Sequence, residues 1–314
     1  MEINDKDKDM PRTETQIVDS IISNRRSLLR LGGSALAGLA LAGIAKAQAT
    51  ISDTDILNFA LNLEYLEAEY YTIATSGMTI DQLGVGITGT GTQGGVTIKN
   101  NSAASAIVPF ATPAFQSYAQ ETAGEERKHV SFLRNALGMS AVAQPAVDLV
   151  NSFNGLAVAA GIGGSFDPFA NEINFLLGSY VFEDVGVTAY HGAAGLITTP
   201  ANLDAAAGIL AVEAYHAGLI RTVLYGLDAA NPSSGINATA TKISQARAAL
   251  DGTNNDDIGL GVVANSLGSA STVVNADANT IAFSRTTAQV LSIVYAGGTG
   301  SGGFFPAGLN GTIK

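Results

Sequence analysis

The chain has 314 residues, of which 46% are hydrophobic and only 14% are charged, and its formal net charge is −11. This length and composition are ample for one sizeable hydrophobic core. The acidic balance leaves no basic patch to neutralise phosphates, which argues against nucleic acid or an anionic membrane surface as a partner.

The first 49 residues are predicted to be an export signal. A charged stretch ends in Asn-Arg-Arg-Ser-Leu-Leu-Arg at residues 24–30, and a Gly/Ala-rich apolar run from Leu31 to Ala45 follows it. This pattern looks like a twin-arginine signal, with cleavage after Ala47 or Ala49. The alternative is a retained anchor, but a run of about 15 residues is short for a membrane span. We therefore expect export to the periplasm or the extracellular space, without stable membrane insertion after cleavage.

Five stretches carry the apolar periodicity of α-helices. The predicted helices cover residues 53–76, 113–137, 168–196, 201–227 and, more weakly, 281–295. Asp53 or Asp55 is a plausible cap for the first helix, and Pro113 suits the first turn of the second. Gly77 and Gly138 are expected to end these two helices.

The connections between the predicted helices are unequal in length. Residues 77–112 form a Gly/Thr/Asn-rich insertion in which 95–98 fit a short strand. Residues 139–167 can cross a bundle from end to end at roughly 3.3 Å per extended residue. Two helix pairs joined by one long crossover predict an all-α four-helix bundle over residues 50–227. Residues 228–314 are expected to form an irregular C-terminal extension, with one helix packing on the bundle.

The strongest functional signal is a repeated Glu-x-x-His pattern. Two of the three histidines follow a glutamate by three residues, in the pairs Glu126/His129 and Glu213/His216. Positions i and i+3 project from the same face of a helix, so each pair can present a carboxylate and an imidazole to one metal. Because the chain has no cysteine, thiolate metal sites and disulfides are excluded, and a metal must take carboxylates and imidazoles.

Two further glutamates lie in apolar helical surroundings. Glu64 and Glu183 would be costly to bury unpaired, and a bound cation is one way to offset that cost. A tyrosine follows each of them by seven residues, Tyr71 and Tyr190. These tyrosines are either plain core aromatics or contacts of a metal ligand. Glu67 shares the helical stripe of Glu64 and competes with it for a place in the site.

Two other polar residues of the predicted helix 168–196 are not expected to bind metal. The third histidine, His191, has Thr188 three residues before it, so the ligand pattern fails and we expect a surface or structural side chain. Asp184 points about 100° away from Glu183 around the helix. It is expected to support a ligand or to act as a cap.

These motifs resemble those of a known family. Leu-Asn-Leu-Glu at residues 61–64, with tyrosine seven positions further on, and Glu-Glu-Arg-Lys-His at 125–129 resemble the first two helices of ferritins and related di-iron carboxylate proteins. Residues 52–310 as a whole are similar to ferritin-like proteins of the desiccation-related kind, whose features include residues 55–67 and Gly-Phe-Phe-Pro at 303–306. The resemblance implies a ferritin-like four-helix bundle.

The resemblance also implies roles for the candidate residues. Glu64 and Glu183 would be outer ligands, Glu126 and Glu213 bridging ligands, and His129 and His216 would each supply an imidazole to one metal. Tyr71, Tyr190 and Glu67 are, from their positions on the predicted helices, the candidates for contacts with these ligands. The centre would hold two iron ions or two manganese ions, and oxygen ligands suit both metals.

Three functions are compatible with such a centre. The first is a di-iron oxidase or peroxidase, or a dimanganese catalase-like enzyme, acting on dioxygen or hydrogen peroxide in stress protection. The second is a non-catalytic stress-protective or structural protein whose metal site stabilises the fold without turnover. The third is iron storage in a cage, which the insertions at 77–112 and 139–167 disfavour. An Ala/Gly-rich helix surface is compatible with a homo-oligomer.

Overall fold

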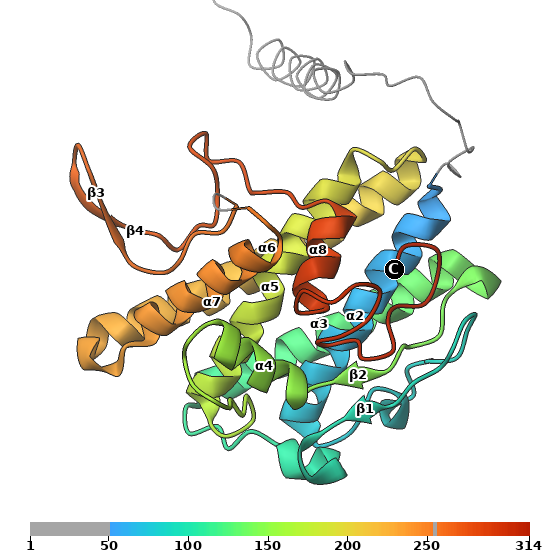
Figure 1. Ribbon diagram of the computed structural model, residues 1–314, viewed down its shortest axis with the longest axis horizontal. Coiled ribbons are helices and arrows are strands. Elements are labelled where there is room, and N and C mark those ends of the chain that lie inside the picture. The colour runs from blue at the N-terminus through green and yellow to red at the C-terminus, as the bar shows by residue number, and fades with distance from the viewer. Residues whose placement is uncertain (1–50, 254–255) are drawn as a thin grey trace, which may run out of the picture. The chain divides into compact units, whose positions relative to one another are not determined.

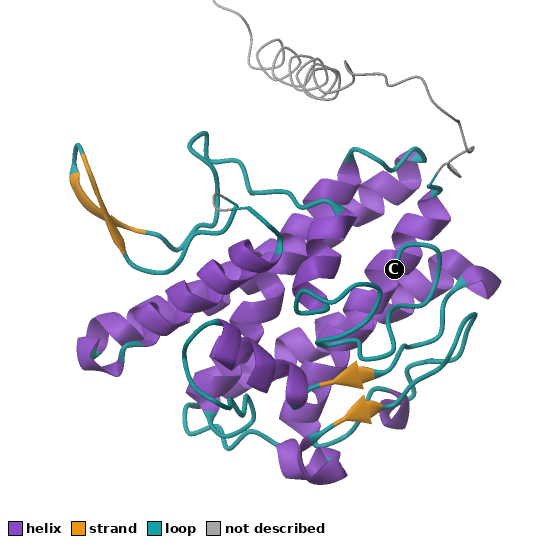
Figure 2. Ribbon diagram, viewed as in Figure 1, coloured by secondary structure: helices purple, strands orange, loops and turns teal. Residues whose placement is uncertain are grey.

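The computed structural model describes residues 51–253 and 256–314, and α-helices dominate it (Figures 1 and 2). The predicted signal at residues 1–49 lies outside the described residues. The α-helices are α2 (Asp53–Ser76), α3 (Pro113–Leu137), α4 (Asn151–Ala159), α5 (Glu172–Ala194), α6 (Pro200–Ala230), α7 (Ile236–Leu250) and α8 (Thr287–Val294). The strands are β1 (Val96–Thr97), β2 (Val147–Asp148), β3 (Val262–Asn265) and β4 (Gly268–Ser271). Short 3-10 helices cover Asp81–Leu83, Lys99–Asn101, Ala103–Ala106, Gly138–Ser140 and Pro232–Ser234. The predicted all-α fold class is confirmed.

The four long helices form two packed pairs, α2 with α3 and α5 with α6, and α2 also packs on α5. Most residues of α2 and α5 are buried, whereas α3 and α6 each bury one face. The two central helices are therefore buried around most of their circumference, and the two outer helices are amphipathic. By length and composition alone α6 could cross a membrane, but its buried face includes Glu213 and His216.

Local sequence signals set the helix ends. Ser52 and Asp55 form a capping box at the start of α2, and Gly77 ends it in the left-handed conformation with φ 67°. The third helix was predicted from residue 168, but α5 starts at Glu172 because the Asn171 side chain accepts a hydrogen bond from the backbone N–H of Asn174. Helix α6 runs to Ala230, slightly beyond the predicted end at 227.

The insertion after α2 and the crossover after α3 are joined to each other. Strand β1 pairs in parallel with β2, in the register Val96 to Val147 and Thr97 to Asp148. The crossover also contains α4, which the sequence analysis did not predict. Phe153 of α4 is buried and packs edge-on against Phe182 of α5, with ring centroids 5.6 Å apart.

The C-terminal region is more regular than predicted. A single helix was expected over residues 228–314, but this region contains α7 and α8 as well as the antiparallel β3–β4 hairpin. The buried positions of α7 include Ile236, Ala240, Ile243 and Arg247. Helix α7 was not predicted because Arg247 interrupts the apolar stripe of its buried face. Charged residues are rarely fully buried unless they are paired.

Three fully buried arginines, Arg221, Arg247 and Arg285, connect this region to the bundle. Arg221 and Arg247 each donate a hydrogen bond of 2.8 Å to Asp184 on α5. Arg247 also forms an ion pair with Asp257 at 2.7 Å. Asp184 therefore fixes the C-terminal region to α5.

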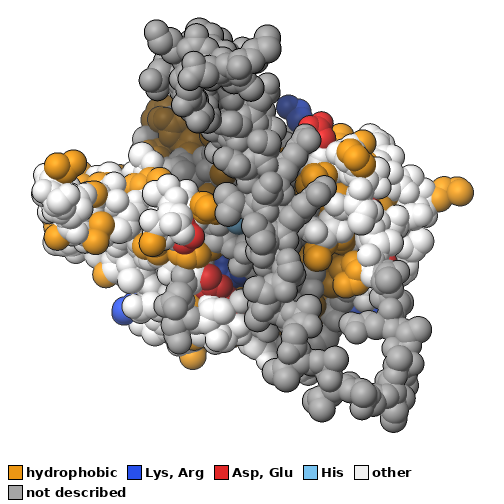
Figure 3. Space-filling view, turned by 90° about the horizontal axis from the view of Figure 1, so that it is seen from above, with side chains coloured by type: hydrophobic (Ala, Val, Ile, Leu, Met, Phe, Trp, Pro, Cys, Tyr) orange, Lys and Arg blue, Asp and Glu red, His pale blue; other side chains and the backbone are white. Residues whose placement is uncertain are grey.

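The last residues of the chain pack on the central helices. Phe304 makes edge-on contacts with Phe153 and Phe182, at centroid distances of 5.2 and 5.0 Å. Asn310 and Asn62 exchange hydrogen bonds of 2.9 and 3.0 Å. Leu63 and Phe304, one from each of the two resemblance motifs, line the same small pocket. On the part of the surface that Figure 3 colours, apolar side chains are widespread and charged side chains are sparse.

Candidate metal centre

The six predicted ligand residues converge in the middle of the bundle. Glu64 comes from α2 and Glu183 from α5, whereas α3 and α6 each contribute a Glu-x-x-His pair. The four glutamates, Glu64, Glu126, Glu183 and Glu213, are at most 1% exposed, and His129 and His216 are 9% and 6% exposed. Each long helix therefore presents its carboxylate to the core and not to solvent.

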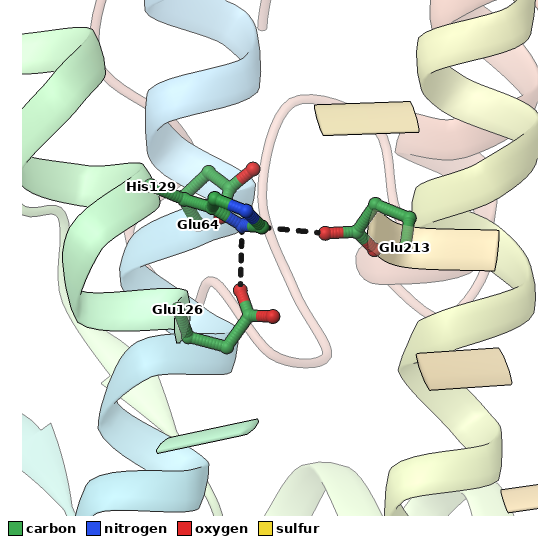
Figure 4. Close-up of side chains that lie close together, drawn as sticks. All are labelled: Glu64, Glu126, His129 and Glu213. Atoms are coloured by element: carbon green, nitrogen blue, oxygen red, sulfur yellow. Dashed lines mark ion pairs between the residues drawn. The ribbon is translucent and has the colours of Figure 1, made fainter. Parts of the chain in front are cut away.

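A first cluster surrounds His129. Its Nδ1 atom lies 3.2 Å from Oε2 of Glu64, 3.4 Å from Oε2 of Glu126 and 3.7 Å from Oε1 of Glu213. Figure 4 shows these side chains converging, with Glu213 approaching from α6. The four ligand atoms lie within 4.8 Å of one another, a grouping that can hold a metal ion.

A second cluster surrounds His216. Its Nδ1 atom lies 3.0 Å from Oε1 of Glu126 and 3.4 Å from Oε2 of Glu183. Glu126 therefore belongs to both clusters, with one oxygen directed at each histidine. The imidazole rings of His129 and His216 are 6.4 Å apart between centroids.

Glu213 is placed differently from Glu126, although the resemblance implied a bridging role for both. The grouping around His216 contains Glu126 and Glu183 but not Glu213. The Oε2 atom of Glu213 instead lies against Gly186 of α5, where a Cβ atom would come within 2.1 Å of it. The lack of a side chain at Gly186 therefore makes room for this carboxylate.

Hydrogen bonds from outside the clusters orient three of these residues. The Tyr71 hydroxyl donates to Oε1 of Glu183, and the Tyr190 hydroxyl donates to Oε1 of Glu64. On the other side, Nε2 of His216 lies 2.8 Å from Oε2 of Glu125, which directs Nδ1 into the cluster. No sequence motif identifies Glu125 as a contact of His216, and only its position beside Glu126 points to the site.

Glu67 lies beside the clusters without belonging to either. It is 6% exposed, and Oε1 lies 3.6 Å from the Cβ position of Gly186, on the same side as Glu213. Burial raises its pKa well above the usual range, and the charges of Glu126, Glu183 and Glu64 raise it further. Its surroundings therefore favour the protonated form of this carboxyl group.

The two other residues considered from the sequence lie outside the clusters. Asp184 binds Arg221 and Arg247, as described above. His191 is half-buried, and its Nδ1 atom lies 3.1 Å from the backbone carbonyl oxygen of Phe283. The structure thus places His191 in a structural contact with the C-terminal region.

The pKa values of the cluster residues diverge. Burial raises the pKa of Glu64 to about 7, against the opposing attraction of His129. Burial would also raise the pKa of Glu126, but the close contacts with His129 and His216 and their charges outweigh burial and lower the pKa to about 2. Burial alone would lower the pKa of His129, yet the charge of Glu64 and the contact with Glu126 raise it to about 11. Burial opposes protonation of His216 as well, but Glu183 and Glu126 raise its pKa, so the metal-free cluster favours the protonated form of both histidines.

The donor atoms fit a cation. Within the described residues, the inward-facing oxygens of Glu64, Glu126, Glu183 and Glu213 and the Nδ1 atoms of both histidines make no hydrogen bonds, although all are buried. Buried polar atoms are normally satisfied, so atoms that converge without pairing indicate a shared partner. Carboxylate oxygens and imidazole nitrogens suit iron, manganese or zinc. The fold and this buried donor set together define a metal-binding ferritin-like protein.

Comparison with known proteins agrees with this class. The family model of the ferritin-like domain matches residues 52–226, and the chain belongs to this family. It is 33% identical over 251 residues to the desiccation-related protein PCC13-62 of Craterostigma plantagineum, covering 76% of each chain. It is 27% identical over 275 residues to the ferritin-like catalase Nec2 of Nesocodon mauritianus, covering 83% of this chain and 85% of the relative. No solved structure gives a significant match.

Proposed function

We propose that the protein binds two iron or two manganese ions and uses them to remove hydrogen peroxide, or to react with dioxygen, in stress protection outside the cytoplasm. The observation that carries this proposal is the position of Glu126, which directs one oxygen to each of two histidine-centred clusters. Two such clusters on one carboxylate are suited to a pair of metals held close together.

The carboxylates and the histidines of the cluster would each bind metal. Glu64 and Glu183 would each bind one metal, and their tyrosine hydrogen bonds would hold the carboxylates in place. His129 and His216 would supply one imidazole to each metal. When bound, a redox-active pair would carry two electrons from one peroxide molecule to another. In that reaction one peroxide takes up two electrons and two protons and becomes two waters, and a second peroxide gives them up and becomes dioxygen.

The relatives support the proposal in part. The relative from Nesocodon mauritianus is named a catalase, which favours hydrogen peroxide as substrate. The export route is inferred from the sequence of residues 24–47 alone. These residues lie outside the part of the chain that the structure describes.

A non-catalytic role is the second candidate. The cluster buries four glutamates whose inward oxygens make no hydrogen bonds within the described residues, and a bound metal would offset this cost whether or not it turns over. The relative from Craterostigma plantagineum is named for desiccation and not for a reaction.

One experiment tests both candidates. Metals bound to the purified full chain are measured by mass spectrometry, beside the His129→Ala/His216→Ala double variant and a His191→Ala control. We expect about two ions of iron or manganese per chain in the wild type and in the control, and a loss of metal in the double variant. Oxygen release from added peroxide would then support the enzyme, and bound metal without turnover would support the structural role. A wild-type chain that takes up no iron or manganese would refute both.

A further inference from the structure

A cavity of about 410 Å³ lies between α2, α5 and the start of α8. Its helical walls are apolar and include Phe59 of α2 and Ala189 of α5. Thr286 and Gln289 line the third side, and they form the capping box that starts α8. The C-terminal region, which packs on α5 through α8, therefore shapes this cavity.

The cavity continues inward as a narrow apolar neck. The residues Ile56, Phe59, Ala189 and Ala193 line both the cavity and a second pocket of about 20 Å³. A water-sized molecule needs roughly 10–15 Å³, so the neck has room for one small molecule. All of its lining residues are apolar or aromatic. A charged molecule entering it would lose its hydration without gaining polar partners.

Two of the residues that line the neck adjoin the metal centre. The neck is bounded by Tyr190, whose hydroxyl donates to Glu64, and by Leu63, which precedes Glu64 in the chain. Leu63 also lines a third pocket of about 20 Å³, which Glu67 and Gly186 border. Gly186 in turn lies against the carboxylate of Glu213. The small pockets on both sides of Leu63 thus end at residues that contact the cluster.

We propose that this series of cavities, the α2–α5 conduit, binds small uncharged molecules and conducts them from the side of α8 to the carboxylate cluster. Dioxygen and hydrogen peroxide share the required size and lack of charge. The identity of the conducted molecule rests on the proposed function, whereas the binding of small apolar molecules in the conduit does not.

Xenon is a direct probe, because it is an uncharged apolar atom that occupies dry cavities. We expect xenon-pressurised crystals of the wild-type protein to show xenon in the neck. Ala193→Leu places a longer side chain at the junction of the cavity and the neck and should abolish this binding. Ala193→Val serves if the leucine variant does not fold. Ala194→Leu is the matched control, because Ala194 is also half-buried near the end of α5 but lines neither pocket.

Stopped-flow oxidation of the reduced, metal-loaded protein by dioxygen and by peroxide gives the second measurement. We expect Ala193→Leu to slow one or both reactions several-fold at unchanged metal content, and Ala194→Leu to match the wild type. The oxidant whose reaction becomes slower in Ala193→Leu is the one that the α2–α5 conduit carries.

Two results would overturn the conduit: an empty neck in the xenon-pressurised wild type, or equal oxidation rates in the two leucine variants. Normal metal content in that case would leave the proposed function standing. Conversely, xenon in the neck of a chain that takes up no metal would overturn the proposed function but support the apolar binding site.

Discussion

Glu126 differs from the other carboxylates of the cluster because it faces both histidines. The resulting contacts lower its pKa to about 2, whereas burial raises the pKa values of Glu64 and Glu213. Glu126 is thus ionised across the physiological pH range, while protons occupy other positions around it. A metal must displace those protons, because it binds carboxylates and neutral imidazoles.

Metal affinity should therefore rise with pH. The pKa of His129 is raised to about 11 and that of Glu64 to about 7, so both carry protons in acidic solution that binding must release. As the pH falls below about 7, Glu64 gains a further proton and affinity falls more steeply. Competition with a chelator at several pH values measures this, and metal addition to a weakly buffered solution should acidify it. Equal affinity at pH 5.5 and 8 would contradict the prediction.

Glu125 should act on the metal through His216. Its carboxylate holds Nε2 of His216 at 2.8 Å, and loss of such an outer contact typically weakens metal binding by roughly ten- to a hundredfold. We expect Glu125→Gln to lower the affinity of one of two metals by about tenfold, as measured by chelator competition. Glu121→Gln, at an exposed position on the same helix, is the control. Equal effects of the two variants would show that Glu125 does not position His216.

At the scale of elements, α7 is held to the bundle by a buried charge network and not by an apolar stripe alone. Arg247 is fully buried and binds Asp184 of α5 and Asp257. Removing one partner of a buried ion pair leaves uncompensated charge, which typically costs about 3–5 kcal/mol.

We therefore expect Arg247→Met to lower the free energy of unfolding by about 3–5 kcal/mol in chemical denaturation. Lys242→Met, at an exposed position of the same helix, should change it by less than about 0.5 kcal/mol. A small effect at Arg247 would mean that α7 does not depend on this network.

The same helix shows where sequence reasoning failed. The four long helices were predictable because their apolar residues recur with helical spacing, and the paired Glu-x-x-His motifs identified residues that the fold does bring together. Helix α7 was missed because its buried face contains Arg247 and Ser244. Their burial depends on partners that no local pattern reveals. Tyr180 is 64 residues from Ser244 in the sequence, and Asp257 follows the end of α7. Glu125 was missed because its partner His216 is 91 residues away.

For the whole molecule, the cluster links metal binding to stability. Its inward-facing carboxylate oxygens and the Nδ1 atoms of its histidines make no hydrogen bonds within the described residues. A ligand that binds the folded state alone stabilises that state by mass action. At free metal of about 100 times Kd this amounts to about 2.7 kcal/mol. We expect chelation to lower the Tm of the wild type and metal to restore it, as measured by calorimetry. The His129→Ala/His216→Ala variant should not respond, and a response equal to that of the wild type would place the metal elsewhere.

The pairing of Asn62 with Asn310 has a consequence for synthesis of the chain on the ribosome. The two residues are 248 positions apart, and at about 5–20 residues per second this interval takes roughly 12–50 s. During that time Asn62 has been made, but its partner has not. Glu64 lies two residues from Asn62 on the same helix, so the surroundings of the first ligand are completed only after Asn310 has been made.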